Sequence, residues 1–202
     1  MPRGPRRLID GGTYHVLTRG NNGQTLFHHE ADHHRYLQLL LAYLRAHHLK
    51  LYHFVLMPDH VHLVLETPRG PTLSKTMSGL NLSYSHYYRK RYRFSGHLWQ
   101  GRFNSLLLDR ERSLLECGRR VELNPVRAGL VQDPRTYPWS SYRVYAEGVA
   151  NAMITPNPLY ELLGTTARQR QDTYRQFIQE GMNGTQGTSG RPHDTPLPRI
   201  LR

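Results

Sequence analysis

Alternating apolar and polar residues predict the strands of this chain, and a longer apolar period predicts its helices. Four segments have a strand pattern or a short apolar run, namely 13–19, 51–57, 60–66 and 103–108. Between them, 30–48 carries apolar residues three and four positions apart, which is typical of a helix packed on one face. Residues 72–93 form a longer segment of mixed periodicity, which we also expect to be helical.

The resulting order is strand, helix, strand, strand, helix, strand. It favours an α+β fold, a ferredoxin-like sandwich with a central antiparallel sheet and helices packed on it. Residues 109–123 are predicted as another helix, which Asn124-Pro125 should end or kink because the residue before proline avoids the α conformation. We expect an irregular closing segment at 132–146, a helix at 158–182, and a disordered tail after that.

Two histidines follow a Pro-Asp turn in the third predicted strand. Because side chains two positions apart point the same way in a strand, His60 and His62 share a face with Val64 and Glu66. Two adjacent imidazoles supply part of a metal site, and Glu66 could orient one of them or end the strand in solvent. In a chain with 13 histidines the pair alone is weak evidence, and two strand histidines without a ligand are the alternative.

Charge narrows the class of partner. The chain has 27 Lys and Arg against 15 Asp and Glu, a net charge of +12, which favours a polyanion such as nucleic acid as its partner.

The length of the chain, 202 residues, suffices for one domain with a tail. The single cysteine, Cys117, excludes an internal disulfide and a multi-cysteine zinc site. No apolar run is long enough for a membrane span and no secretory signal is evident, so we expect a cytoplasmic protein with no membrane partner.

The most basic aromatic segment is 84–93. On a helix, Tyr84 and Tyr88 would share a face with Arg91 and could stack on bases, while the neighbouring cations meet phosphates; the alternative is a tyrosine-rich packing face. Gln100 and Asn104 could also contact phosphate or base. The candidate DNA-binding residues are Arg19, Tyr84, Tyr88, Arg89, Lys90, Arg91, Arg93 and Arg102.

Five motifs occur in order between residues 11 and 146. They are Tyr14-His-Val-Leu-Thr-Arg-Gly-Asn-Asn22, Met57-Pro-Asp-His-Val-His-Leu-Val-Leu-Glu66, Gly96-His-Leu-Trp-Gln-Gly-Arg-Phe103, Asn124-Pro-Val-Arg-Ala-Gly-Leu-Val131 and Trp139-Ser-Ser-Tyr142. Together they resemble the IS200-like single-tyrosine (HUH) transposase superfamily, and within it the branch of REP-associated tyrosine transposases. The resemblance suggests a basic N-terminal arm at 1–10, a catalytic domain at 11–146, a helical extension at 147–182 and a disordered tail at 183–202.

The resemblance implies an enzyme that cleaves and rejoins single-stranded or hairpin DNA. In such transposases a divalent metal, Mg²⁺ or Mn²⁺, polarises the scissile phosphate, and a helix-borne tyrosine attacks it to give a 5′-phosphotyrosine. Carried over to this chain, the metal ligands are His60 and His62, with Asn124 as a third oxygen ligand. Relatives act as homodimers or as monomers, and the sequence does not decide between them.

The chain departs from the family at the nucleophile. Relatives carry tyrosine four residues before the asparagine of Asn-Pro-Val, and here that position is Arg120. A guanidinium stays protonated and has no lone pair with which to attack phosphorus, although it could clamp a phosphate. Enzymatic activity is therefore an open question.

Three explanations remain open. Another tyrosine, one of Tyr84, Tyr87, Tyr88 or Tyr92, could reach the metal; metal-bound water could attack directly, making a nuclease; or the protein binds DNA and metal and cleaves poorly or not at all. The function is thus either a metal-dependent single-strand endonuclease and transposase or a catalytically impaired hairpin-DNA-binding protein. An RNA-binding module on the same type of sheet is a weaker alternative.

Overall fold

The computed structural model describes residues 8–108 and 113–183. Most of the predicted N-terminal arm, residues 109–112 and the predicted tail from 184 onward lie outside these ranges. The chain divides into two compact units where the sequence suggested one domain, namely Met1–Leu51 with Leu56–Leu108, and Tyr52–Val55 with Asp109–Arg202. The functional boundaries at 146 and 182 stay predictions. Among the described residues, no helix is both long enough and apolar enough to span a membrane.

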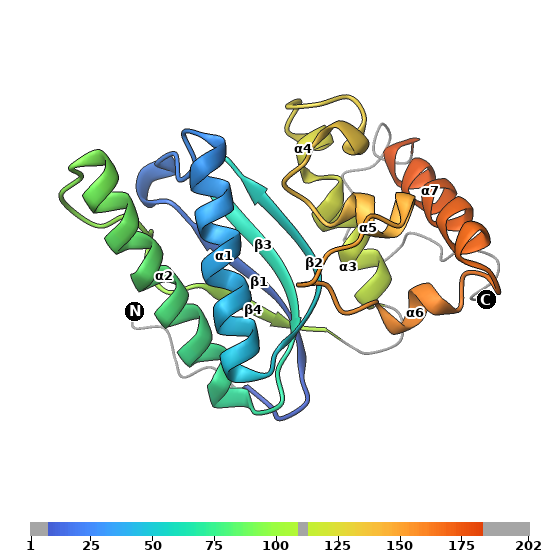
Figure 1. Cartoon of the computed structure of the whole chain (residues 1–202), viewed down its shortest axis with the longest axis horizontal. Coiled ribbons are helices and arrows are strands. Elements are labelled where there is room, and N and C mark those ends of the chain that lie inside the picture. Colours follow the sequence, from blue (N-terminus) through green and yellow to red (C-terminus); the bar gives the residue numbers. More distant parts are fainter. Residues whose placement is uncertain (1–7, 109–112, 184–202) are drawn as a thin grey trace. The chain divides into compact units, whose positions relative to one another are not determined.

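The first unit carries the predicted sandwich (Figure 1). Its elements in chain order are β1 (Thr13–Arg19), α1 (Glu30–His47), β2 (Lys50–Met57), β3 (His60–Glu66), α2 (Gly70–Tyr92) and β4 (Asn104–Leu107). The strand order is β2-β3-β1-β4, and β1 pairs antiparallel with both β3 and β4. This is the ferredoxin-like order, so the predicted fold class is confirmed.

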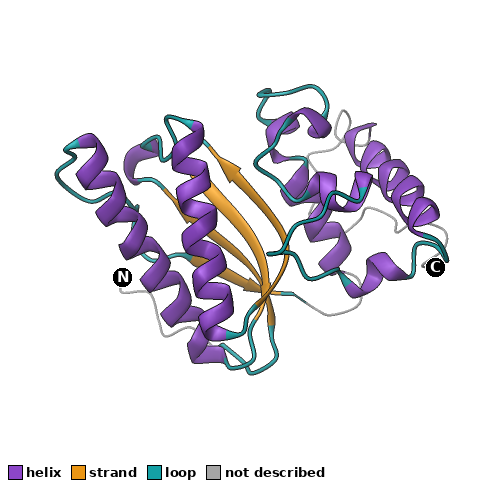
Figure 2. Ribbon diagram, viewed as in Figure 1, coloured by secondary structure: helices purple, strands orange, loops and turns teal. Residues whose placement is uncertain are grey.

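The two faces of this sheet differ. Every second residue of β1 and β3 is buried on one face, namely Tyr14, Val16, Thr18, Val61, Leu63 and Leu65. Helices α1 and α2 cover this face (Figure 2), and Asn81 of α2 donates a side-chain N–H to Thr18 Oγ1 at 3.1 Å. The histidines of β3 lie on the opposite face, which we call the histidine face.

A buried carboxylate, Asp32, joins the start of α1 to the end of α2. It accepts the backbone N–H groups of His28 and His29 and the hydroxyl groups of Tyr87 and Tyr92. Burial by itself raises the pKa of Asp32, but the hydrogen bonds from Tyr92, Tyr87 and the backbone outweigh it and hold that pKa below its ordinary value. The aromatic end of α2 is therefore tied to α1 by an ionised group.

The second unit, apart from Tyr52–Val55 of β2, is helical. Its elements are α3 (Ser113–Glu122), α4 (Asn124–Arg127), a 3₁₀ helix (Pro134–Thr136), α5 (Tyr142–Glu147), α6 (Pro158–Glu161) and α7 (Ala167–Asn183). As predicted, a helix ends just before Asn124-Pro125, and the short α4 restarts there. A cluster of buried aromatic and aliphatic side chains from these helices forms the core, including Leu115, Leu123, Tyr145, Tyr174 and Phe177.

Two predictions in this unit were wrong. The single helix expected at 158–182 is interrupted, because Gly164 disfavours a helix after α6 and Thr166 Oγ1 accepts the N–H of Gln169 to start α7 anew. The segment 132–146 was expected to be irregular, yet its end forms α5. Such short helices give too few turns for a clear apolar period.

Candidate metal and DNA-binding site

His60 and His62 lie side by side at the start of β3, as the alternation predicted. Their ring centroids are 5.0 Å apart and their planes are nearly perpendicular, at 83°. Both side chains are half-buried. On the neighbouring strand β1, Leu17 pairs with His62 and Arg19 pairs with His60, so both flank the histidines on the histidine face.

Each imidazole has a partner for its Nδ1 atom. His60 Nδ1 lies 2.5 Å from Asp59 Oδ1, and His62 Nδ1 lies 2.8 Å from His15 Nε2. Within the described residues neither Nε2 atom makes a hydrogen bond. This is the usual arrangement of metal-ligating histidines. Glu66, considered from the sequence as an orienting group, instead pairs with Lys50 at 2.9 Å.

His60 and His62 could bind a divalent metal ion, but two ligands do not complete its coordination shell. In the part of the chain that the structure describes, His, Cys, Asp and Glu side chains form no group of three that could hold a metal ion. Two imidazoles suit Mn²⁺ better than Mg²⁺, which prefers oxygen ligands. Remaining positions would be taken by amide, phosphate or water oxygens. Asn124 belongs to the second unit, and its role as a ligand stays a prediction.

The environment of His62 keeps its ring neutral. Burial, together with the neighbouring groups His15, His60 and Arg19, lowers the pKa of His62 to about 3. A neutral imidazole is the form that binds metal ions. His62 is therefore ready to bind a metal at neutral pH without first losing a proton.

We expect the metal-free protein to lose stability as the pH falls from about 6.5 toward 3. In the unfolded chain His62 takes up its proton near pH 6.5, about the ordinary histidine value, whereas in the folded protein it does so only at about 3. The unfolded state thus binds more protons across this window, which favours unfolding. Urea unfolding at about pH 7 and about pH 4.5 should show a smaller loss of unfolding free energy in His62→Gln than in wild type. Equal losses would contradict the assignment.

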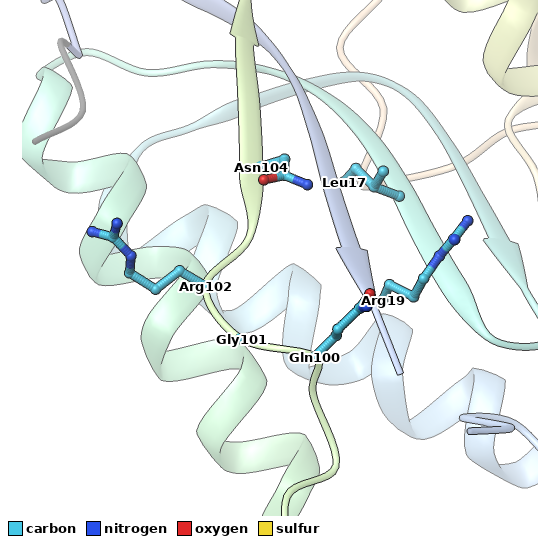
Figure 3. Close-up of a pocket in the computed structure, with 6 residues that line it drawn as sticks. All are labelled: Leu17, Arg19, Gln100, Gly101, Arg102 and Asn104. Atoms are coloured by element: carbon cyan, nitrogen blue, oxygen red, sulfur yellow. The ribbon is translucent and has the colours of Figure 1, made fainter. Parts of the chain in front are cut away.

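A pocket of about 200 Å³ opens on the histidine face at β1 and β4, and Figure 3 shows the residues that line it. Its lining comes from β1, β4 and the loop before β4: Leu17, Arg19, Gln100, Gly101, Arg102 and Asn104. Leu17 pairs with His62 on one side and with Asn104 on the other, so the pocket is one strand away from His62. The N–H of Gln100 donates to the carbonyl of Arg19 at 2.9 Å, which holds the loop against β1. Guanidinium groups suit phosphates, and carboxamides suit base edges.

The tyrosines predicted to stack on bases are instead buried. Tyr84 and Tyr88 are 0% and 1% exposed. Their hydroxyl groups donate to the carbonyls of Leu26 and Thr25, at 2.6 and 3.0 Å. A ring without an exposed face cannot stack on a base, so the packing alternative holds for both.

The cations near the end of α2 are exposed. They are Arg89, Lys90, Arg91 and Arg93. Arg89 donates to the carbonyl of Gly96, and Arg91 pairs with Asp32 at 3.3 Å. DNA contact by these four residues stays a prediction.

Comparison with known proteins decides the family. The family model described as "Transposase IS200 like" matches residues 9–115, more than half of the chain. The chain belongs to the IS200-like transposase family. The match includes β1 to β4, the histidine pair and the pocket, so both parts of the candidate site lie in the segment that defines the transposase family.

Two solved structures are similar to this transposase-family chain. One is a REP-associated tyrosine transposase bound to a REP hairpin, with a TM-score of 0.64, 19% identity, and coverage of 77% of this chain and 92% of that one. The other is a candidate transposase from Deinococcus radiodurans R1, with a TM-score of 0.41, 20% identity, and coverage of 65% and 94%. Among curated proteins, none matches the chain. The first likeness supports the fold described above.

Arg120 and Asn124 lie where α3 gives way to α4. Arg120 is half-buried in the last turn of α3. The Nδ2 atom of Asn124 donates to the carbonyls of Arg120 and Val121, at 3.1 and 3.3 Å. Asn124 therefore uses its amide nitrogen to cap α3, and its side-chain oxygen is left as the atom that could bind a metal.

The tyrosines of the first unit lie away from the histidine face. They lie on the helix-covered side of β1 or on α1 and α2, and are Tyr14, Tyr36, Tyr43, Tyr84, Tyr87, Tyr88 and Tyr92. Burial raises the pKa of Tyr87 to about 12, with the hydrogen bond to Asp32 adding to the effect. None of these phenols lies on the histidine face.

The described tyrosines and the cysteine of the second unit lie in surroundings that disfavour their ionised forms. Five of its tyrosines are buried, namely Tyr52, Tyr142, Tyr145, Tyr160 and Tyr174. Burial also raises the pKa of the half-buried Tyr137 to about 12 and that of Cys117, on α3 beside Arg120, to about 12. Phenols and thiols in such surroundings stay protonated and react poorly.

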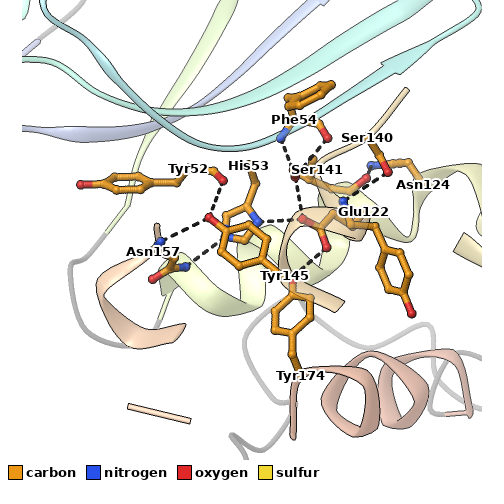
Figure 4. Close-up of polar contacts among 12 residues, drawn as sticks. Tyr52, His53, Phe54, Glu122, Asn124, Ser140, Ser141, Tyr145, Asn157 and Tyr174 are labelled. Carbon is orange, nitrogen blue, oxygen red and sulfur yellow. Dashed lines mark hydrogen bonds and ion pairs between the residues drawn. The ribbon is translucent and has the colours of Figure 1, made fainter. Parts of the chain in front are cut away.

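A buried carboxylate fixes α3 inside the second unit (Figure 4). Glu122 accepts hydrogen bonds from His53 Nδ1 at 2.9 Å, Ser141 Oγ at 2.6 Å and Tyr174 OH at 2.7 Å. Asn157 Nδ2 lies 3.0 Å from His53 Nε2. Because an amide nitrogen only donates, His53 accepts at Nε2 and carries its proton on Nδ1, facing Glu122. We call these five residues the Glu122 network.

A second buried contact ties α3 to α7. Arg119 donates to the carbonyl of Phe177 at 3.1 Å and to Glu116 at 2.6 Å, and its guanidinium lies 4.2 Å from the centroid of the Phe177 ring. Sequence reasoning missed Arg119, Glu122, His15 and Asp59. A hint existed for the first two, since Arg119 and Glu122 fall three residues apart on the apolar side of the helix.

Proposed function

We propose that this member of the transposase family binds single-stranded or hairpin DNA on the histidine face, holds a divalent metal at His60 and His62, and does not form the covalent phosphotyrosine intermediate. One observation supports the proposal: the position to which the resemblance assigns the nucleophile holds Arg120. The first unit's tyrosines lie on the helix-covered side, and the second unit's are buried or have a raised pKa. We assign the chain to the REP-associated branch, which the five sequence motifs and the likeness to the hairpin-bound relative support.

The residues of the histidine face have distinct tasks in this proposal. His60 and His62 would hold Mn²⁺ or Mg²⁺, and the bound ion would withdraw charge from a phosphate oxygen. Arg19 and Arg102 would bind the phosphates on either side of the pocket, while Gln100 and Asn104 would face a base. Arg120 would bind a phosphate that it cannot attack.

Fluorescence anisotropy with a labelled DNA hairpin that carries a single-stranded flank tests the proposal. The hairpins are taken from the flanks of the gene, and a fully paired duplex of the same sequence is the comparison. We expect tight, salt-dependent binding to the hairpin with its flank, weaker binding to the duplex, and no cleavage in Mn²⁺. Equal binding to both would contradict the DNA preference. Cleavage without a covalent adduct would show that water serves as the nucleophile.

Arg102→Ala should weaken hairpin binding and lower its salt dependence. Each phosphate contact to single-stranded DNA contributes about 0.7 to the slope of log K against log salt, and the variant should lose about that amount. Arg45→Ala is the matched control, because Arg45 is an exposed cation on α1, on the helix-covered side of the sheet. If both variants lose equal affinity, the pocket has no special role in binding.

A further inference from the structure

His15 of β1 reaches the histidine pair from the neighbouring strand. It pairs with Val64 in the β1–β3 register, one diagonal step from His62 on the same face. Its ring stacks on the His62 ring, with centroids 5.0 Å apart and planes 14° from parallel. The stack brings His15 Nε2 to 2.8 Å from His62 Nδ1. Both the ring contact and the hydrogen bond therefore fix the orientation of the His62 imidazole.

We propose that His15 is a positioning residue for metal binding: its Nε2 accepts the Nδ1–H of His62 and so holds His62 in the tautomer whose Nε2 lone pair can bind a metal. This inference rests on the metal site of the proposed function. It assigns a role to a residue outside the His-x-His pair.

The hydrogen bond between two neutral imidazoles has only two forms. If His15 donates from Nε2, His62 carries its proton on Nε2 and has no lone pair there for a metal. If His62 donates from Nδ1, its Nε2 lone pair is available. Metal binding at His62 Nε2 thus requires the second form, in which His15 is protonated on Nδ1 and accepts at Nε2.

The partner of His60 sharpens this assignment. Asp59 Oδ1 lies 2.5 Å from His60 Nδ1. An ionised carboxylate only accepts, so this hydrogen bond requires the His60 proton to be on Nδ1. His62 has a neutral partner in place of a carboxylate. The two histidines thus have one carboxylate and one imidazole as acceptors. Two carboxylates would place more negative charge beside the metal and weaken its attraction for a phosphate.

Long-range ¹H–¹⁵N NMR of the imidazoles and calorimetric titration with Mn²⁺ test the proposal. His15→Phe keeps a stacking ring and removes the acceptor nitrogen, whereas His15→Gln places an amide oxygen near the position of Nε2. We expect His62 to be protonated on Nδ1 in the metal-free wild type. His15→Phe should weaken Mn²⁺ binding about 10- to 100-fold, and His15→Gln should restore most of it. His86→Phe, at an exposed histidine of α2, is the matched control.

The two measurements separate failure of this inference from failure of the proposed metal site. His62 protonated on Nε2 in the metal-free wild type, or unchanged Mn²⁺ affinity in His15→Phe, would overturn the role of His15. Absence of Mn²⁺ binding in wild type would overturn the metal site itself, and the tautomer of the metal-free protein would still decide whether His15 accepts. Thermal unfolding shows whether His15→Phe is folded, and the wild-type spectrum decides the tautomer if it is not.

Discussion

Arg120→Tyr is expected to turn a protein that forms no covalent DNA adduct into one that does. The substitution supplies a phenol at the position to which the resemblance assigns the nucleophile, and a phenolate can attack phosphorus whereas a guanidinium cannot. With a labelled hairpin and Mn²⁺, a denaturing gel should show a slow-migrating, protease-sensitive band only for the variant. The expected change is from no detectable adduct to a clear fraction of the DNA in one incubation.

Two matched variants make this result interpretable. Arg120→Phe adds a ring without the hydroxyl and should give no adduct, and Arg120→Tyr combined with His60→Ala should also give none, because it lacks one of the proposed metal ligands. An adduct formed by the wild type would mean that another tyrosine serves and that the protein is an active transposase. If Arg120→Tyr binds both hairpin and Mn²⁺ and still forms no adduct, position 120 is not the nucleophile position.

Glu122→Ala is expected to destabilise the second unit by about 3–5 kcal/mol, as the removal of one member of a buried charged network usually does. The substitution deprives His53, Ser141 and Tyr174 of their shared acceptor, and buried donors without a partner are costly. Tyr174→Phe removes one donor and keeps the carboxylate, so it should cost about 1.5–3 kcal/mol.

Tryptophan fluorescence can follow this unit by itself within the full chain. The protein has two tryptophans, Trp99 in the first unit and Trp139 in the second. In a Trp99→Phe background, urea unfolding reported by Trp139 therefore measures the second unit. A change of less than about 1 kcal/mol for Glu122→Ala would show that the network contributes little, the range seen for exposed ion pairs.

The sheet could be predicted from the sequence because its signals are local. Alternation in 13–19 and 60–66 gave β1 and β3 with the bounds that the structure shows, and it placed His60 and His62 on one face. The helix-covered face follows from the same alternation. Its apolar residues form a continuous buried layer, and the helical periods of 30–48 and 72–93 supply the helices that cover it.

The partners of the site residues could not be predicted in the same way. Asp59 could have been found, since it precedes His60 in the turn, but the contact between His15 and His62 depends on the register of β1 against β3. The Glu122 network joins residues up to 104 positions apart, as in the contact between His53 and Asn157. The place of Glu122 on the apolar side of its helix hints that this carboxylate is buried, but the sequence does not show which groups it contacts. The prediction that Tyr84 and Tyr88 stack on bases is not supported for the same reason. Helical spacing shows that two side chains share a face of the helix, but it does not show whether that face is buried.

The inward contacts of α3 have a consequence for how this chain tolerates change. Arg119 and Glu122 hold the helix through buried groups, while Arg120 between them is half-exposed. In a library of single substitutions selected only for folded protein, positions 119 and 122 should be depleted and position 120 should accept most residues except proline. Substitution at position 120 thus carries little penalty for the fold, so the residue there can change while the buried contacts of Arg119 and Glu122 keep the scaffold unchanged.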